Sequence, residues 1–308
     1  MDIVGRFLLS AKIDEQIKAI TWSSNDQEPD CVARLVKNLP RIISDSLKAL
    51  YPSRSVSVGG AFIHQKPLAH FLNRPGFRDP ELGDLLLVVR EKRSFGHAYN
   101  ALLLQAKCVN DVFCASVPVD HQFILYSEWP TFKYVRAGAL NGRCRTVRPR
   151  TLTQGAEYLL IDRKTPSNMY TASVNNPLEA ESRFAYSVAS VIAFDRGRTF
   201  QVHYPRDRWS EMILDLLKMS ANAVFNRRRS GYIRTNRWTG DRAFMYLLND
   251  ESENEIIYVD DINIDDEKGY LSGVSTICVD LGVSELDDSV KSQRPKWNEM
   301  QSDVHAFD

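Results

Sequence analysis

The sequence predicts an α/β protein with a central mixed sheet, followed by a mainly helical region. Two short, continuously apolar runs, at 84–89 and 101–107, are typical of neighbouring strands that are buried on both faces. Apolar residues at helical spacing predict helices over 31–49 and 206–229. The 308 residues are 44% hydrophobic and 25% charged, which is enough apolar material for one large domain or two smaller ones.

The first elements are a helix and a strand. Pro40 lies inside the predicted helix 31–49, so we expect it to kink or split that helix. Valines alternate with serines in the segment that follows, which predicts a strand over 55–64. The pair Gly59-Gly60 predicts a bend or bulge in this strand.

A hairpin is the central prediction. The polar segment 90–100 separates the two apolar runs, so we expect it to form the long tip of that hairpin. Residues 119–128 fit either a short helix or another strand, and 158–162 fits a strand.

The second half of the sequence is predominantly helical in pattern. Helix 178–194 begins after Asn-Asn-Pro, with acidic residues in its first turn. Helix 206–229 places basic residues at its C-terminal end, where the helix dipole favours them. Segments 244–250 and 255–264 resemble strands, and a loosely held polar tail is expected from about Val283.

Charge is unevenly distributed although the net charge is zero. From Asp250 to the end there are 16 acidic and 4 basic residues, which leaves 23 acidic and 35 basic residues before it. The first part therefore carries +12 and the last part −12. Such asymmetry indicates either contact with nucleic acid or an acidic end that folds back and neutralises the rest.

The chain contains five scattered cysteines without CxxC spacing: Cys31, Cys108, Cys114, Cys144 and Cys278. This pattern predicts neither a disulfide framework nor a zinc site, but reduced thiols in a cytoplasmic protein. No run of eighteen apolar residues occurs, so no membrane partner is expected.

A group of polar residues flanks the two predicted strands of the hairpin. Asp84 begins the first of the two runs, and Gln105 and Lys107 end the second. Residues two apart in a strand share a face, so the last two side chains point the same way. Buried Gln and Lys need partners, and Asp84 would supply a charge in a register that pairs it with Gln105.

Such a trio has the groups needed for phosphodiester hydrolysis. Mg²⁺ prefers oxygen ligands and keeps several waters, so a carboxylate, an amide oxygen and the phosphate suffice to bind it. A lysine beside the ion would help to orient the attacking water and would stabilise the transition state electrostatically.

Over residues 30–165 this arrangement resembles the PD-(D/E)xK nucleases, whose restriction-endonuclease-like core is ordered αβββαβ. The resemblance implies that Asp84 binds metal, that Gln105 replaces the family's second acid, and that Lys107 is catalytic. Because Gln is neutral, weaker metal affinity is expected. The Gln-Ala-Lys motif is similar to that of Mrr-like enzymes, which implies Mg²⁺ or Mn²⁺, DNA rather than RNA, and bacterial defence against foreign DNA.

Four further residues are candidates for the same site. Glu81 is either a second metal ligand or a solvated turn residue. His64 and Gln65 either contact phosphate or water, or are structural. The family's additional acid from the first helix would be Asp45.

Two basic stretches that contain aromatic residues, 129–150 and 226–238, fit a nucleic-acid substrate. The alternative is a solvated basic face. The candidate nucleic-acid-binding residues are Arg143, Arg145, Arg148, Arg227, Arg228 and Arg229.

The sequence thus predicts a nuclease core over 1–165, a helical or mixed accessory region over 166–282 and a polar tail over 283–308. The predicted function is a metal-dependent endonuclease acting on DNA, with an activating protein partner or self-association as further possibilities. One alternative is a catalytically inactive nucleic-acid-binding or assembly subunit of a defence complex. Another is a structural hairpin in which Asp84 and Lys107 form only a buried ion pair.

Overall fold

The computed structural model describes most of the chain as one α/β assembly. The described residues are 1–23, 25–64, 67–74, 76–116, 121–148, 155–202, 205, 207–228, 231–234, 238–241 and 273–284. No helix within these ranges is long and apolar enough to cross a membrane.

The described ranges contain five α-helices and one 3₁₀ turn. They are α1 (Ile3–Ala19), α2 (Glu28–Leu50), α3 (His121–Glu128), α4 (Phe184–Ile192), α5 (Arg208–Val224) and η1 (Gly138–Leu140). The strands are β1 (Arg54–Ala61), β2 (Leu68–Phe71), β3 (Leu85–Arg93), β4 (Gly96–Val109), β5 (Phe132–Val135), β6 (Cys144–Arg145), β7 (Ala156–Asp162), β8 (Met169–Ala172), β9 (Ser182–Arg183), β10 (Arg198–Thr199), β11 (Phe225–Arg228), β12 (Gly231–Arg234), β13 (Trp238–Gly240) and β14 (Ser275–Ser284).

A large mixed sheet forms the centre of the protein, as the sequence predicts. Its order is β13-β1-β14-β3-β4-β7-β8-β9, and β10 pairs with β4. β3 and β4 are antiparallel, whereas β14 runs parallel to β3 and β7 runs parallel to β4. Two smaller sheets, β2-β5-β6 and β11-β12, lie outside this path.

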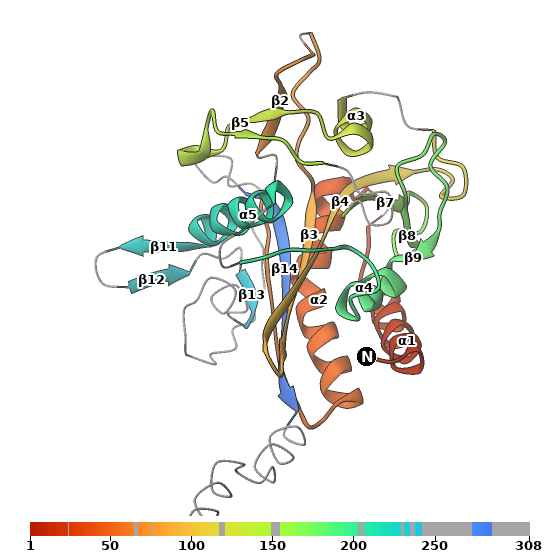
Figure 1. The fold of residues 1–308 in the computed structure, drawn as a ribbon. Helices are drawn as coiled ribbons and strands as arrows, with labels where there is room; N and C mark the ends of the chain where they lie inside the picture. Colours follow the sequence, from red (N-terminus) through yellow and green to blue (C-terminus); the bar gives the residue numbers. More distant parts are fainter. Residues whose placement is uncertain are drawn as a thin grey trace, which may run out of the picture.

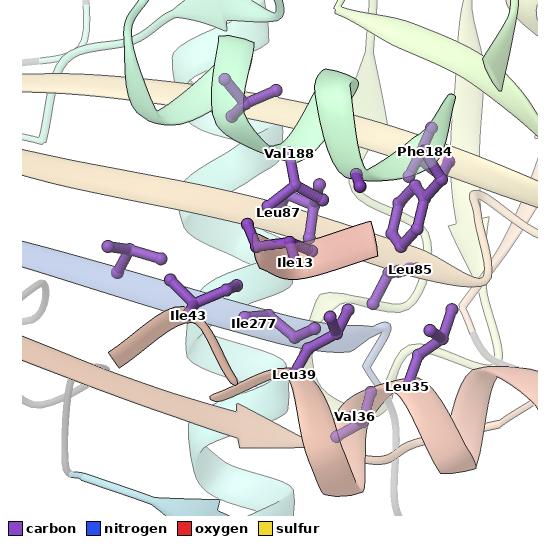
Figure 2. Close-up of a cluster of buried hydrophobic side chains, with 14 of the residues drawn as sticks. Ile13, Leu35, Val36, Leu39, Ile43, Leu85, Leu87, Phe184, Val188 and Ile277 are labelled. Carbon is purple, nitrogen blue, oxygen red and sulfur yellow. The ribbon is translucent and has the colours of Figure 1, made fainter. Parts of the chain in front are cut away.

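Helices cover both faces of the large sheet (Figure 1). One apolar cluster joins α1, α2 and α4 to the sheet, and another joins α3, α5 and the β2-β5-β6 sheet to its opposite face. Figure 2 shows the first cluster, in which Leu85 and Leu87 of β3 and Ile277 of β14 lie between side chains of the three helices. Burial on both faces explains why the central strands are continuously apolar in sequence.

The predicted hairpin is confirmed, but its long tip is wrong. Pairing between β3 and β4 continues through the polar residues as far as Arg93 opposite Gly96, which leaves Ser94 and Phe95 as the turn. Gly96 has φ +119°, a region that favours glycine, so it closes the tight turn without a steric penalty.

The predicted helix 31–49 is confirmed as part of α2, and Pro40 lies inside it without splitting it. The expected bulge at Gly59-Gly60 is wrong, because pairing of β1 with β14 is regular there. A Cβ on Gly60 would lie 3.0 Å from the Val36 carbonyl oxygen, which is the acceptor that Pro40, having no N–H, cannot satisfy. Glycine here allows close packing of the strand on the helix.

The region after residue 165 is mixed rather than mainly helical. It contributes α4 and α5, but also β14, which lies between β1 and β3 in the middle of the sheet. The predicted helix 178–194 begins only at Phe184, because Ser182 and Arg183 pair with β8. The predicted helix 206–229 ends at Val224, and the basic residues after it continue into β11.

Two further predicted elements lie within the described residues, and two predicted strands do not. Residues 121–128 form helix α3 and 156–162 form strand β7. The predicted strands 244–250 and 255–264 lie outside the described residues. The predicted tail, from about Val283, overlaps the end of β14. Its residues from 285 onward lie outside the described residues.

Replacing Leu87 by Ala tests the packing in Figure 2. Leu87 is 4% exposed and lies in the cluster that joins α1, α2 and α4 to the sheet. A loss of about 2–5 kcal/mol in the free energy of unfolding is therefore expected. Leu8→Ala is the matched control, because Leu8 is 49% exposed and should change stability by about 0.5 kcal/mol or less. Urea denaturation measures both, and equal losses would contradict the described burial.

Candidate active site

The candidate site lies at the edge of the sheet where β3 begins and β4 approaches its end. Leu85 pairs with Leu104, so Asp84 lies opposite Gln105, in the register that the sequence predicts. The backbone N–H of Asp84 donates to the Leu104 carbonyl at 2.9 Å, which extends the ladder by one more bond. The backbone of the hairpin therefore fixes where the Asp84 carboxyl group lies.

The Asp84 carboxylate is bound to the backbone and side chain of β4. Its Oδ2 atom accepts a hydrogen bond from the Ala106 backbone N–H at 2.8 Å and another from the Gln105 side-chain amide. Gln105 is only 2% exposed, whereas Asp84 is half-buried. The carboxyl group is thus held against β4 and partly shielded from solvent.

Burial raises the pKa of Asp84 well above its ordinary value. The nearby Glu81 carboxylate raises this pKa further, and Glu28 adds a smaller effect in the same direction. The Ala106 N–H and the Lys107 ammonium act in the opposite direction, because both stabilise the charged form. Asp84 is therefore an acid that a neighbouring cation would help to ionise.

Lys107 faces an acid that the sequence analysis did not identify. Its Nζ atom lies 3.8 Å from Oε2 of Glu28, the first residue of α2. The Lys107 side chain is 26% exposed. The other oxygen of Glu28 accepts from the Cys108 backbone N–H at 3.1 Å. Among the described residues, Lys107 pairs with Glu28 rather than Asp84, so the simple Asp84–Lys107 ion pair is not formed.

Asp45, the acid expected from this helix, is exposed and lies 3.6 Å from Arg41 on the surface. The helix does deliver an acid to β4, but from its first turn. The available signal was Glu28 followed by Pro29, a pair typical of a helix start.

Tyr126 of α3 supports the turn that precedes Asp84. Its hydroxyl donates to the Leu82 carbonyl at 2.9 Å in a buried contact. A Cβ on Gly83 would lie 2.7 Å from the Leu103 side chain and 2.9 Å from the Tyr126 hydroxyl, so only glycine fits there. Burial raises the pKa of Tyr126 well above its ordinary value, and the Asp84 charge adds to this effect.

Glu81 is half-buried and forms an isolated bridge to Leu68 of β2. The Glu81 charge raises the pKa of Asp84, because a like charge disfavours the ionised form.

His64 is half-buried and follows β1 at the same edge of the sheet. The residue before it, Ile63, is held by Ser275 of β14, whose hydroxyl donates to the Ile63 carbonyl at 2.7 Å. Ser275 pairs with Leu85, so this end of β1 lies two strands away from the start of β3. Gln65 lies outside the described residues.

One observation supports a hard cation as a ligand of the oxygen atoms in this site. The side-chain Oε1 atom of Gln105 is buried and has no hydrogen-bond partner among the described residues. Buried acceptors are rarely unsatisfied, so a free amide oxygen next to a half-buried carboxylate is a suitable place for a cation. In the described part of the chain, however, no three His, Cys, Asp or Glu side chains form a group that could hold a metal ion.

The candidate nucleic-acid-binding arginines differ in environment. Arg143 and Arg148 are exposed near the β5–β6 hairpin. Arg227 and Arg228 lie on β11, and Arg229 lies outside the described residues.

Arg145 is 7% exposed and belongs to a buried ionic network. Its guanidinium donates to the Asp215 carboxylate of α5 at 2.5 and 2.9 Å, and lies 3.3 Å from Glu211. The Tyr134 hydroxyl donates to the same Asp215 oxygen at 3.0 Å. Arg145 therefore joins the small sheet to α5, and its charge is already neutralised.

Comparisons with known proteins do not assign this chain to a family. No protein-family model, no curated protein and no solved structure matches it.

Asp84→Asn is expected to raise the free energy of unfolding at pH 7. The pKa of Asp84 is higher in the folded protein than in the unfolded chain, so the stability linked to this group is complete below the unfolded pKa, about 3.9. That stability is lost as the pH rises through the folded pKa, by about 1.4 kcal/mol for each unit of difference.

Urea denaturation at pH 7 and pH 4 measures this effect. The advantage of Asp84→Asn should shrink at the lower pH, and Asp45→Asn on the surface should show no advantage at either. A variant equally destabilised at both pH values would contradict the assigned cost of the buried charge.

Proposed function

We propose that this protein is a metal-dependent nuclease that hydrolyses phosphodiester bonds in DNA. The observation that supports it best is Asp84, held against β4 beside Gln105, with Lys107 two residues further along the same strand face. Buried polar groups that share one edge of a sheet and have perturbed ionisation are typical of functional sites.

The order of elements supports the restriction-endonuclease-like core implied by the family resemblance. Leaving out the small sheet, α2, β1, β3, β4, α3 and β7 follow in the order αβββαβ. The departure is β14, which separates β1 from β3 and comes from the far end of the described sequence.

The protein's own residues would divide the chemistry between them. Asp84, Gln105 and Glu81 would hold Mg²⁺ or Mn²⁺, which when bound supplies charge neutralisation and lowers the pKa of a coordinated water. Lys107 would orient that water or stabilise the negative charge that develops on the phosphate. Glu28, 3.8 Å from the lysine, would hold the ammonium in position.

The exposed Arg143 and Arg148 are the described candidates for contact with the substrate backbone. A role in bacterial defence, a preference for DNA over RNA, and activation by a partner or by self-association rest on the family resemblance.

A second function is favoured by the neutral side chain of Gln105. Its amide already donates to Asp84, an interaction that stabilises the carboxylate without a cation. Under this alternative the protein is a nuclease-like subunit that binds nucleic acid and does not cut it. Both functions require binding, but only the first requires cleavage that depends on metal and on Lys107.

Lys107→Ala is expected to reduce plasmid cleavage by at least about 100-fold, because removal of one preorganised charge-stabilising group typically costs that much. Purified protein is incubated with plasmid DNA, single-stranded DNA and RNA in Mg²⁺, in Mn²⁺ and in EDTA. Lys92→Ala provides a matched control, since Lys92 is an exposed lysine near the opposite end of β3.

EDTA should abolish wild-type cleavage, and Lys92→Ala should cut like the wild type. Binding without cleavage in every metal would favour the inactive subunit, and undiminished cutting by Lys107→Ala would exclude this lysine from the chemistry.

Gln105→Glu is expected to lower the Mn²⁺ or Mg²⁺ concentration that gives half-maximal cleavage by about tenfold, or about 1.4 kcal/mol. A second carboxylate would add charge where the neutral amide now lies. Gln16→Glu, on the exposed face of α1, is the control. An unchanged or higher metal requirement would remove Gln105 from the set of ligands.

A further inference from the structure

Two cysteines lie beside the candidate site, on elements far apart in sequence. Cys31 lies in the first turns of α2 and is buried, whereas Cys108 follows Lys107 on β4 and is half-buried. Cys31 belongs to the apolar cluster between the sheet and α2, and Cys108 packs against the same cluster. The elements that hold them are in direct contact, because the Cys108 backbone N–H donates to Glu28 at 3.1 Å.

The two thiols are chemically unequal. Interaction with the Cys31 thiol lowers the pKa of Cys108, and the positive charge of Arg163 acts in the same direction against the opposing effects of burial and Glu28. The same interaction raises the pKa of Cys31, and burial raises it further. Cys108 is therefore the more easily ionised and more accessible thiol, with a neutral partner next to it.

The other three cysteines lack this arrangement, and all five lie in described residues. Cys114 and Cys144 are exposed, and the Cys144 thiol donates to the Gly142 carbonyl at 3.7 Å. Cys278 is buried in the centre of the sheet. Cys31 and Cys108 are therefore the pair that packs in one apolar cluster, where α2 contacts β4.

We propose that Cys31 and Cys108 form a reversible disulfide when the protein meets a peroxide, and that this bond links α2 to β4 beside Lys107. The Cys108 thiolate attacks one peroxide oxygen, and with uptake of a proton it yields a sulfenic acid and one water from H₂O₂. The Cys31 sulfur then displaces the sulfenic hydroxyl, which leaves with the Cys31 proton as a second water. The two sulfurs lose two electrons in total, and a dithiol reductant returns them.

The bond would alter the geometry of the candidate site. To form the bond, the two sulfurs must approach to about 2.05 Å. Glu28 lies one turn before Cys31, and Lys107 directly precedes Cys108. The displacement would therefore change the 3.8 Å contact between this acid and this lysine. This consequence for cleavage rests on the proposed nuclease function, whereas formation of the disulfide does not.

The bond is tested on the full chain with Cys114→Ser and Cys144→Ser, which removes the exposed thiols. After treatment with H₂O₂, non-reducing proteolysis and mass spectrometry should detect a peptide pair joined through Cys31 and Cys108, which disappears with dithiothreitol. With Cys31→Ser added, Cys108 should instead be trapped by dimedone as a sulfenic acid.

Wild-type protein treated in parallel guards against a folding defect in these variants. Absence of the joined peptide from both proteins, with Cys108 still a free thiol or an unresolved sulfenic acid, would overturn the proposal.

A cleavage assay then tests the effect on the site. Oxidation should reduce cleavage at least fivefold in the protein with Cys31 and Cys108, dithiothreitol should restore it, and Cys31→Ser should be insensitive. A disulfide that forms without changing cleavage would overturn its regulatory effect. Absence of cleavage before and after oxidation would instead count against the nuclease function and leave the mass-spectrometric result intact.

Discussion

The pairing of β3 with β4 is the constraint on which the rest of the structure depends. It runs from Leu85 opposite Leu104 to Arg93 opposite Gly96. The two-residue turn that joins the strands fixes the register of this pairing. A shift by one residue would exchange the faces of every side chain. Apolarity alone would not resist such a shift, since both faces are buried, but the contact of Asp84 with the Ala106 N–H would be lost. The same register thus fixes the fold and the candidate site.

This register places an acid where its charge is poorly solvated. The Ala106 N–H, the Gln105 amide and a nearby lysine stabilise the negative charge of Asp84, against burial and two further carboxylates. The remainder of the fold tolerates this cost because two apolar clusters cover the sheet on both sides. Functional sites commonly combine such a local cost with a well-packed scaffold.

Local features were predictable from sequence and distant ones were not. The hairpin and the Asp84–Gln105 juxtaposition follow from segments about twenty residues apart, where periodicity and strand geometry suffice. Glu28 and Tyr126 reach the site only through the packing of α2 and α3, which no spacing in the sequence reveals. β14 was hidden for the same reason, since nothing in its apolar run indicates that it enters between β1 and β3.

Gln105 accounts for two properties of the site. Its amide holds Asp84 in place without a cation, and its lack of charge implies weak affinity for metal. A glutamate there could not donate to Asp84, and two carboxylates in contact would repel until a cation arrived. The amide satisfies Asp84 in the absence of any ion, and leaves its own oxygen without a partner. Under the proposed function a cation must compete with this hydrogen bond and gains the unpaired oxygen in return. Under that function, the side chain that satisfies Asp84 without metal would therefore also set how tightly metal is held.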